Sequence, residues 1–181
     1  MDGSALVVTD DRNAKDPEWL VEMAQHVERQ FLQLEAEGSE LVMEFRAEKI
    51  ELIARLNEQL AAETAISKRR RRAYLPLNLF ARLHRGHMEV YWQEVHQNPR
   101  TKTAAYTYIR KSTKEGGYTT RHLKTFIHGG EEEVDLVLRT EAKAHSIRSR
   151  WKSLIKIQAS LRAYSRNAGK LRQGGGSEKS D

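Results

Sequence analysis

Two apolar stripes at helical spacing, one in each half of the chain, constrain the fold of these 181 residues more than any other feature. The first stripe passes through Leu20, Met23, Val27, Phe31 and Leu34, and a similar pattern continues from Leu41 to Leu60. The second follows a heptad spacing through Val137, Ala144, Ile147, Trp151, Leu154, Gln158 and Leu161. Apolar residues three or four positions apart lie on one face of an α-helix. The sequence therefore predicts long helices near both ends of the chain, with Trp151 in a core.

The N-terminal stripe predicts a pair of helices. Asp16-Pro17-Glu18 has the composition of a helix start, because Asp caps free amides and Pro fits the first turn. Gly38-Ser39 interrupts the stripe, and Gly commonly follows the end of one helix while Ser caps the next. We predict helices over residues 17–37 and 39–66. The sequence leaves open whether they form one continuous helix.

The middle of the chain predicts a β-hairpin over residues 87–111. Residues 87–96 are rich in Val, Tyr and Trp, residues 103–111 are rich in Thr, Tyr and Ile, and turn residues lie between them. Side chains alternate between the two faces of a strand. In the expected register one face carries Val90, Trp92, Thr107 and Ile109, and the other carries Tyr91, Tyr106, Tyr108 and Arg110. A slip of one residue would exchange these sets.

The last third of the chain predicts a long basic helix. Residues 118–127 first suggest a third short strand or a single helical turn. The helix then opens at Glu131-Glu132-Glu133, whose carboxylates suit the positive end of the helix dipole, and fades near residues 167–169. The predicted fold class is α+β and mostly helical, with an N-terminal helical pair, a small antiparallel β-hairpin or sheet and a long basic C-terminal helix.

These elements divide the chain into four expected regions. They are a flexible N-terminus over 1–15, an acidic helical region over 16–66, a unit of basic β-hairpin plus C-terminal helix over 67–168, and a disordered tail over 169–181.

Charge is strongly segregated along the chain, although the net charge is only +6. Residues 1–65 hold six basic and fifteen acidic residues, whereas residues 66–128 hold fourteen basic and three acidic ones. Residues 139–181 are again basic, with eleven cations and three acids. Such asymmetry indicates an anionic partner for the basic part. The alternative is that acidic helices lie against basic ones within the fold.

The basic middle of the chain supplies the candidate nucleic-acid contacts. Cations replace the counterions condensed on phosphates, a two-stranded ribbon fits the DNA major groove, and Tyr rings stack on unpaired bases. The alternative is a solvated hairpin whose tyrosines pack on the helices. The candidate residues are Lys68, Arg69, Arg70, Arg71, Arg72, Arg100, Lys102, Tyr106, Tyr108, Arg110, Lys111, Lys114, Arg121 and Lys124.

Several classes of site lack their sequence signals. The chain has no cysteine, so thiolate metal sites, cysteine nucleophiles and disulfides are excluded. Its histidines are scattered, and no phosphate-loop, dinucleotide-binding or nucleophile-elbow motif occurs. No apolar run reaches the roughly 20 residues that span a bilayer, and the start lacks the pattern of a secretory signal. We therefore expect a cytoplasmic protein that is not an enzyme, with no metal, no cofactor and no membrane partner.

A resemblance to a known family follows from the order of these features. A Trp-bearing strand (residues 88–92), a strand with a basic end (residues 106–111), a Gly-Gly-Tyr turn (residues 116–118) and a basic C-terminal helix follow one another. Over about residues 75–165 this order resembles the MobI-type auxiliary proteins of conjugative elements. The resemblance implies action at the transfer origin beside the relaxase, with binding of origin DNA and without catalysis by this chain.

The expected function is that of a non-catalytic DNA-binding protein, plausibly such an auxiliary factor at the origin of transfer. The expected partners are double-stranded DNA, with a relaxase or other transfer protein and a homodimer as further candidates. One alternative is a helical scaffold or adaptor that binds a protein through its coiled-coil seams. Another is a binder of RNA or single strands through stacking tyrosines.

Overall fold

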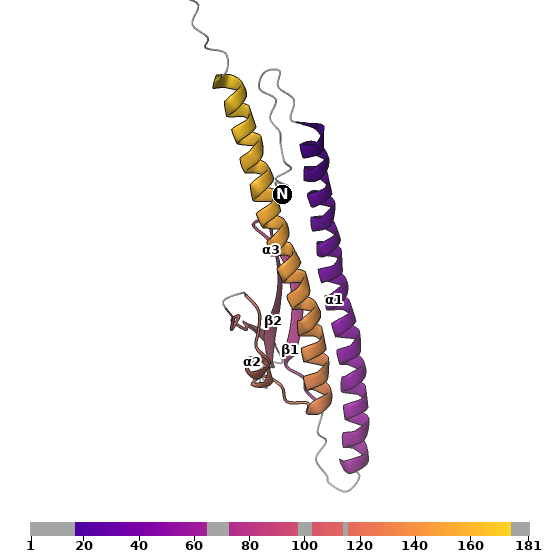
Figure 1. The fold of residues 1–181 in the computed structure, drawn as a ribbon. Coiled ribbons are helices and arrows are strands. Elements are labelled where there is room, and N and C mark those ends of the chain that lie inside the picture. Colours follow the sequence, from indigo (N-terminus) through magenta and orange to yellow (C-terminus); the bar gives the residue numbers. More distant parts are fainter. Residues whose placement is uncertain (1–16, 65–72, 98–102, 114–115, 175–181) are drawn as a thin grey trace, which may run out of the picture. The chain divides into compact units, whose positions relative to one another are not determined.

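The computed structural model describes residues 17–64, 73–97, 103–113 and 116–174 (Figure 1). Its elements are α1 (Glu18–Thr64), β1 (Leu77–His84), β2 (His87–Gln97), β3 (Ala104–Tyr108), α2 (Thr120–Lys124) and α3 (Glu131–Gly174). The predicted class, α+β and mostly helical with a small antiparallel sheet and a long C-terminal helix, is confirmed. Among the helices in these ranges, none is long and apolar enough to cross a membrane.

The chain forms two compact units, and α1 and α3 contribute to both. One unit comprises the described residues up to Leu34 and from Ser149 onward. Within it, the rings of Phe31 and Trp151 lie 4.6 Å apart, and Trp151 is buried, as predicted. The other unit comprises the described residues from Glu35 to Arg148 and contains the sheet. This second unit positions the candidate site.

The predicted helical pair is one continuous helix, because Gly38 lies buried inside α1. The Ser39 hydroxyl donates to the carbonyl of Glu35 at 3.0 Å, within the same helix, and caps no new one. A Cβ atom on Gly38 would lie 2.2 Å from the terminal methyl of Met88. The glycine therefore lets the helix approach the sheet closely and does not end it.

The sheet is antiparallel with strand order β1-β2-β3. Gln93 pairs with Tyr108 and Glu94 with Thr107, so the predicted hairpin and its assignment of faces are confirmed. Strand β1 is an addition to the predicted hairpin. It joins β2 through the two residues Arg85 and Gly86, with φ of 51° and 73°. Positive φ at both central positions is the geometry of a tight type I′ hairpin.

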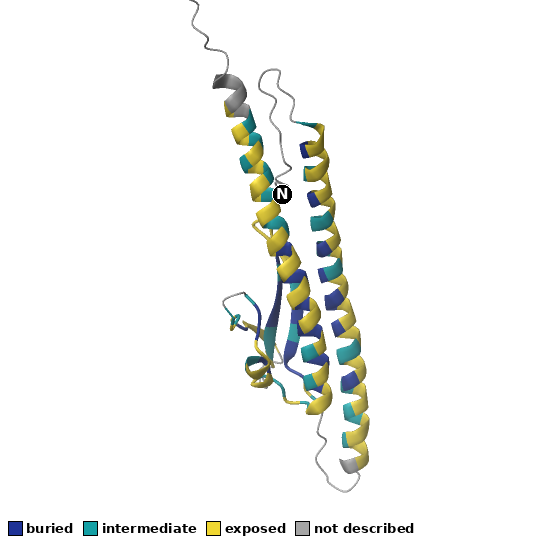
Figure 2. Ribbon diagram, viewed as in Figure 1, coloured by how far each residue is buried: buried dark blue, intermediate teal, exposed yellow. Residues whose placement is uncertain are grey.

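The inner face of the sheet forms the core of this unit together with α1 and α3. Leu79, Val90 and Trp92 are fully buried, and the ring of Phe45 meets Trp92 edge to face at 5.0 Å. Figure 2 shows the buried positions of this part of α1 on the side that faces the sheet. Residues 118–127, expected to be a strand or a helical turn, contain the short helix α2.

A buried network of polar groups connects the sheet to α3. The Glu141 carboxylate pairs with Arg148, and both side chains are more than nine-tenths buried. It also accepts a hydrogen bond from the Trp92 indole at 2.9 Å and one from the Tyr118 amide at 3.3 Å. Arg148 in turn donates to the carbonyl of Val90 at 3.1 Å. A single ion pair thus joins α3 to β2 and to the segment before α2.

A partly buried charge lies where α1 meets β1. The Lys49 amine donates to the Leu77 carbonyl at 2.7 Å and to the Asn78 side chain at 2.6 Å. Burial lowers the pKa of Lys49 from 10.5 to about 8, and the negative charge of Glu133 opposes this shift. Glu133 itself accepts hydrogen bonds from the amides of His128, at 2.8 Å, and Gly129. The Glu133 contacts hold the segment that leads into α3.

Side chains of different size at position 38 test whether Gly38 is needed for the close packing of α1 on the sheet. Gly38→Ala requires only that the flexible end of Met88 move, and it gains up to about 1 kcal/mol of helix propensity. Gly38→Leu must displace Val90 and Ala81 as well, and we expect a loss of about 1–3 kcal/mol. Urea denaturation measures both effects. Equal stability of the Ala and Leu variants would contradict the close packing of α1 on the sheet.

Removing the charge of Glu141 will test the buried network. Glu141→Gln leaves the Arg148 guanidinium buried without its counterion, and we expect a loss of about 3–5 kcal/mol in the free energy of unfolding. The matched control is Glu44→Gln, which breaks the exposed pair with Lys143 and should cost less than about 1 kcal/mol. Similar losses in the two variants, measured by urea denaturation, would be inconsistent with the network as described.

Lys49 makes stability depend on pH in alkaline solution. In the folded protein the partly buried Lys49 amine loses its proton near pH 8, whereas in the unfolded chain it keeps that proton up to about pH 10.5. Between these values the unfolded state binds more protons, so the free energy of unfolding should rise with pH. Denaturation between about pH 7.5 and 9.5 measures the slope, and Lys49→Met should lack this contribution. The range ends below the titration of Tyr118, because burial raises the pKa of that phenol.

Candidate nucleic-acid interface

The face of the sheet opposite the core carries a continuous set of aromatic rings. Phe80 stacks on Tyr91 with ring centroids 5.9 Å apart, and it meets Tyr106 edge to face at 6.2 Å. Tyr91 also contacts Tyr108 at 5.3 Å. Strand alternation explains this arrangement, because all four residues lie at positions that point away from the buried set. We call Phe80, Tyr91, Tyr106 and Tyr108 the outer aromatic face.

The two tyrosines of β3 are the accessible part of the outer aromatic face. Tyr106 is 56% exposed and Tyr108 is 45% exposed, whereas Tyr91 is buried beneath its neighbours. All described residues of β3 are exposed. The exposed rings therefore rest against inner aromatic rings and present their remaining surface to solvent.

Arginines lie over this face. The guanidinium of Arg46, from α1, lies 5.6 Å from the centre of the Phe80 ring, and that of Arg82 lies 5.1 Å from the Tyr91 ring. Arg82 also pairs with Glu89 at 2.8 Å, and this hydrogen bond raises the pKa of Arg82. Both positions combine a fixed positive charge with an aromatic surface.

Three further cations gather where β3 leads into α2. Arg110, Arg121 and Lys124 are exposed, and none of them pairs with an acid among the residues that the structure describes. The His122 ring nitrogen Nε2 lies 3.2 Å from the Arg110 carbonyl, which can only accept, so Nε2 carries the proton. This contact holds α2, with Arg121 and Lys124, beside Arg110.

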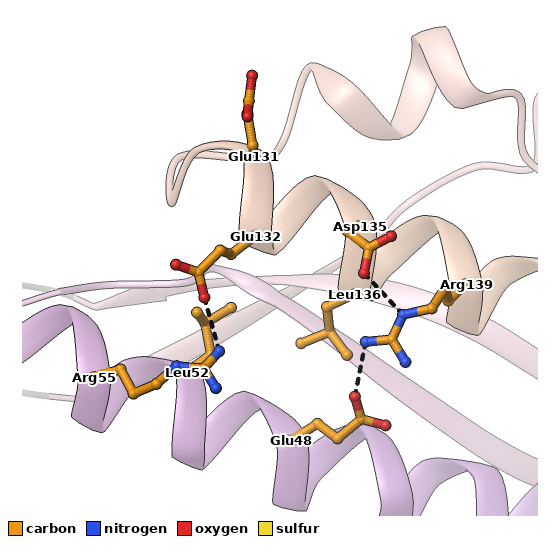
Figure 3. A pocket seen from close by; sticks show the side chains of 8 residues that line it. All are labelled: Glu48, Leu52, Arg55, Glu131, Glu132, Asp135, Leu136 and Arg139. Atoms are coloured by element: carbon orange, nitrogen blue, oxygen red, sulfur yellow. Dashed lines mark hydrogen bonds and ion pairs between the residues drawn. The ribbon is translucent and has the colours of Figure 1, made fainter.

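The cations between the two long helices, unlike these three, are paired with carboxylates. Arg139 pairs with Glu48 at 2.9 Å, Lys143 pairs with Glu44 at 2.8 Å, and Arg55 pairs with Glu132 at 2.7 Å. Figure 3 shows two of these pairs across a shallow hollow of about 290 Å³ between α1 and α3. The alternative interpretation of the charge segregation, acidic helix against basic helix, therefore holds for these cations. It does not hold for Arg110, Arg121 and Lys124.

The structure places some of the predicted contacts together. Tyr106, Tyr108, Arg110, Arg121 and Lys124 are exposed in the sheet layer, and Lys111 beside them is partly buried. The remaining predicted contacts lie outside the described residues; they are Lys68, Arg69, Arg70, Arg71, Arg72, Arg100, Lys102 and Lys114.

Sequence reasoning missed Phe80, Arg82 and Arg46. Phe80 and Arg82 belong to strand β1, which the sequence analysis does not predict, although the alternation of Leu77, Leu79 and Ala81 with polar and aromatic residues is a usable signal. Arg46 lies on a helix, and nothing in its sequence context indicates a contact with the sheet.

The histidines and carboxylates that could suggest a catalytic or metal site lie in structural contacts instead. His84 and His87, the closest histidine pair, lie opposite each other across the β1–β2 turn. Glu141 is held in the buried pair with Arg148. Within the described ranges, no group of three or more histidines and carboxylates is arranged to hold a metal ion.

Comparison with known proteins identifies a family. The family model described as MobI protein matches residues 34–162, which include the whole sheet, α2, the outer aromatic face and the buried network. No curated protein and no solved structure matches the chain. Because the family match covers well over half of the sequence, the chain belongs to the MobI family of mobilisation-related proteins.

Proposed function

We propose that the chain is a non-catalytic DNA-binding protein that acts as an auxiliary factor at the origin of transfer of a conjugative element. The observation that carries the proposal is the cluster of exposed cations Arg110, Arg121 and Lys124, which we call the basic cluster. Family membership supplies the mobilisation context. The basic cluster supplies the positive charges that would contact the phosphates of DNA.

The state of each cation decides how much it contributes to phosphate binding. A cation that pairs with no carboxylate in the unbound protein can release counterions from DNA without first breaking an internal ion pair. Arg139 and Lys143 would first have to leave Glu48 and Glu44. The basic cluster should therefore contribute more to binding than Arg139 and Lys143 do.

The proposal assigns no reaction to this chain. Its buried carboxylates already have structural roles, since Glu141 neutralises Arg148 and Glu133 accepts the amides before α3. Cleavage at the origin would fall to a relaxase, which we propose as a protein partner. The chain would act in the cytoplasm, where the DNA of such an element lies.

The salt dependence of duplex binding tests the proposal. Fluorescence anisotropy with a labelled duplex from the element's transfer origin should give a steep decrease in affinity as salt rises. Replacing Arg121 and Lys124 by Gln should flatten the slope of log K against log salt by about 0.9 for each phosphate that the variant no longer neutralises. Duplex affinity should decrease most at low salt.

The matched control replaces Arg139 and Lys143 by Gln and removes the same amount of charge. These cations are held by carboxylates, so the slope should stay close to that of the unaltered protein. Equal effects of the two double variants would show that only net charge matters and would contradict the basic cluster. Absence of duplex binding even at low salt would overturn the proposed function.

A further inference from the structure

We propose that the outer aromatic face binds single-stranded DNA, with unpaired bases stacked on Tyr106 and Tyr108. This inference rests on the proposed DNA-binding function and names a substrate class for the sheet layer. The basic cluster explains attraction to any phosphate backbone. The outer aromatic face adds stacking, which needs unpaired bases that duplex DNA does not offer.

The placement of the two tyrosines suits stacking. They occupy alternate positions on β3, so their attachment points lie about 6.7 Å apart along the strand. This separation is about twice the 3.4 Å spacing of successive bases in one DNA strand. Each ring can therefore take its own base from an extended strand, as sheet aromatics do in single-strand binders.

The rings are already held in place. Tyr106 leans on Phe80 and Tyr108 leans on Tyr91, yet each keeps about half of its surface exposed, at 56% and 45%. A ring supported from behind loses little conformational freedom when a base stacks on it. Large exposed aromatics that are also immobilised are typical of a binding surface.

The outer aromatic face is open to solvent at its two β3 tyrosines, and these rings can stack only on bases that are unpaired. The helices α1 and α3 pack against the opposite, inner face of the sheet, through Phe45 with Trp92 and Arg148 with the Val90 carbonyl. In a duplex the faces of the bases are covered by their neighbours in the stack. A side chain that reads base faces therefore needs bases that are unpaired and unstacked.

The charge around the rings fits a nucleic acid better than an apolar peptide. Arg46 lies over the Phe80 ring, and Arg110 continues the alternation of Tyr106 and Tyr108 at the end of β3. A strand whose bases stack on the two tyrosines would run its phosphates toward these cations. Arg110 would thus serve both the basic cluster and the aromatic face.

Removing the rings while keeping apolar side chains tests the inference. We would measure anisotropy of a labelled oligothymidylate and of a duplex of equal length, at one salt concentration, with Tyr106→Leu plus Tyr108→Leu. The single-strand affinity should decrease at least about fivefold, while duplex affinity stays unchanged. The variant Tyr106→Phe plus Tyr108→Phe keeps the rings and should retain single-strand binding.

Tyr164→Leu is the matched control, because Tyr164 is 49% exposed and belongs to the other unit. It should leave both affinities unchanged. Equal losses for single strand and duplex in the Leu variant, or no loss for the single strand, would overturn the stacking inference. Salt-sensitive duplex binding in the same protein would leave the proposed function intact.

The affinities for a mixed-sequence DNA oligonucleotide and for the RNA of the same sequence are then compared. Stacking reads the base face and should give similar affinities for the two sugars when the bases are the same. A strong preference for RNA would overturn the assignment to DNA. Thermal unfolding of each variant verifies that the sheet is intact, which the exposure of both tyrosines leads us to expect.

Discussion

The ion pair between Glu141 and Arg148 is the interaction on which the rest of this unit depends. Burying two charges is costly unless both receive further hydrogen bonds, and here Trp92 and the Val90 carbonyl supply them. All four partners lie on α3 or β2, so the pair fixes which face of the sheet turns toward the helix. The opposite face, with its tyrosines, therefore points away from α3.

Among the described residues, some charged side chains pair within the fold and others do not. Pairs such as Arg139 with Glu48 tie α3 to α1 near the surface, where each contributes less than about 1 kcal/mol. They also neutralise part of the negative charge of α1 locally. In the sheet layer, Arg110, Arg121 and Lys124 pair with no acid among the residues that the structure describes. The modest net charge hides this division.

Sequence periodicity predicts what depends on local pattern and fails where tertiary contacts decide. The heptad spacing predicts α3 and the burial of Trp151, and strand alternation predicts the faces of β2 and β3. Gly38 resembles a helix end in sequence, because nothing local shows that Met88 packs there. Strand β1 escapes prediction because its turn uses Arg85 in a left-handed conformation, where Asn is the more usual residue. The tyrosines of the site are predicted, but Phe80, which supports one of them, is not.

The register of β3 links the buried network to the open face. The Ile109 amide donates to the Trp92 carbonyl at 3.0 Å, and the Tyr118 hydroxyl donates to the Ile109 carbonyl at 3.1 Å. The Trp92 amide donates to the same hydroxyl at 3.3 Å. A slip of one residue would turn Tyr108 toward the core and Ile109 toward solvent. The buried Tyr118 hydroxyl, which binds both β2 and the residue after β3, therefore helps to fix which side chains of β3 face outward.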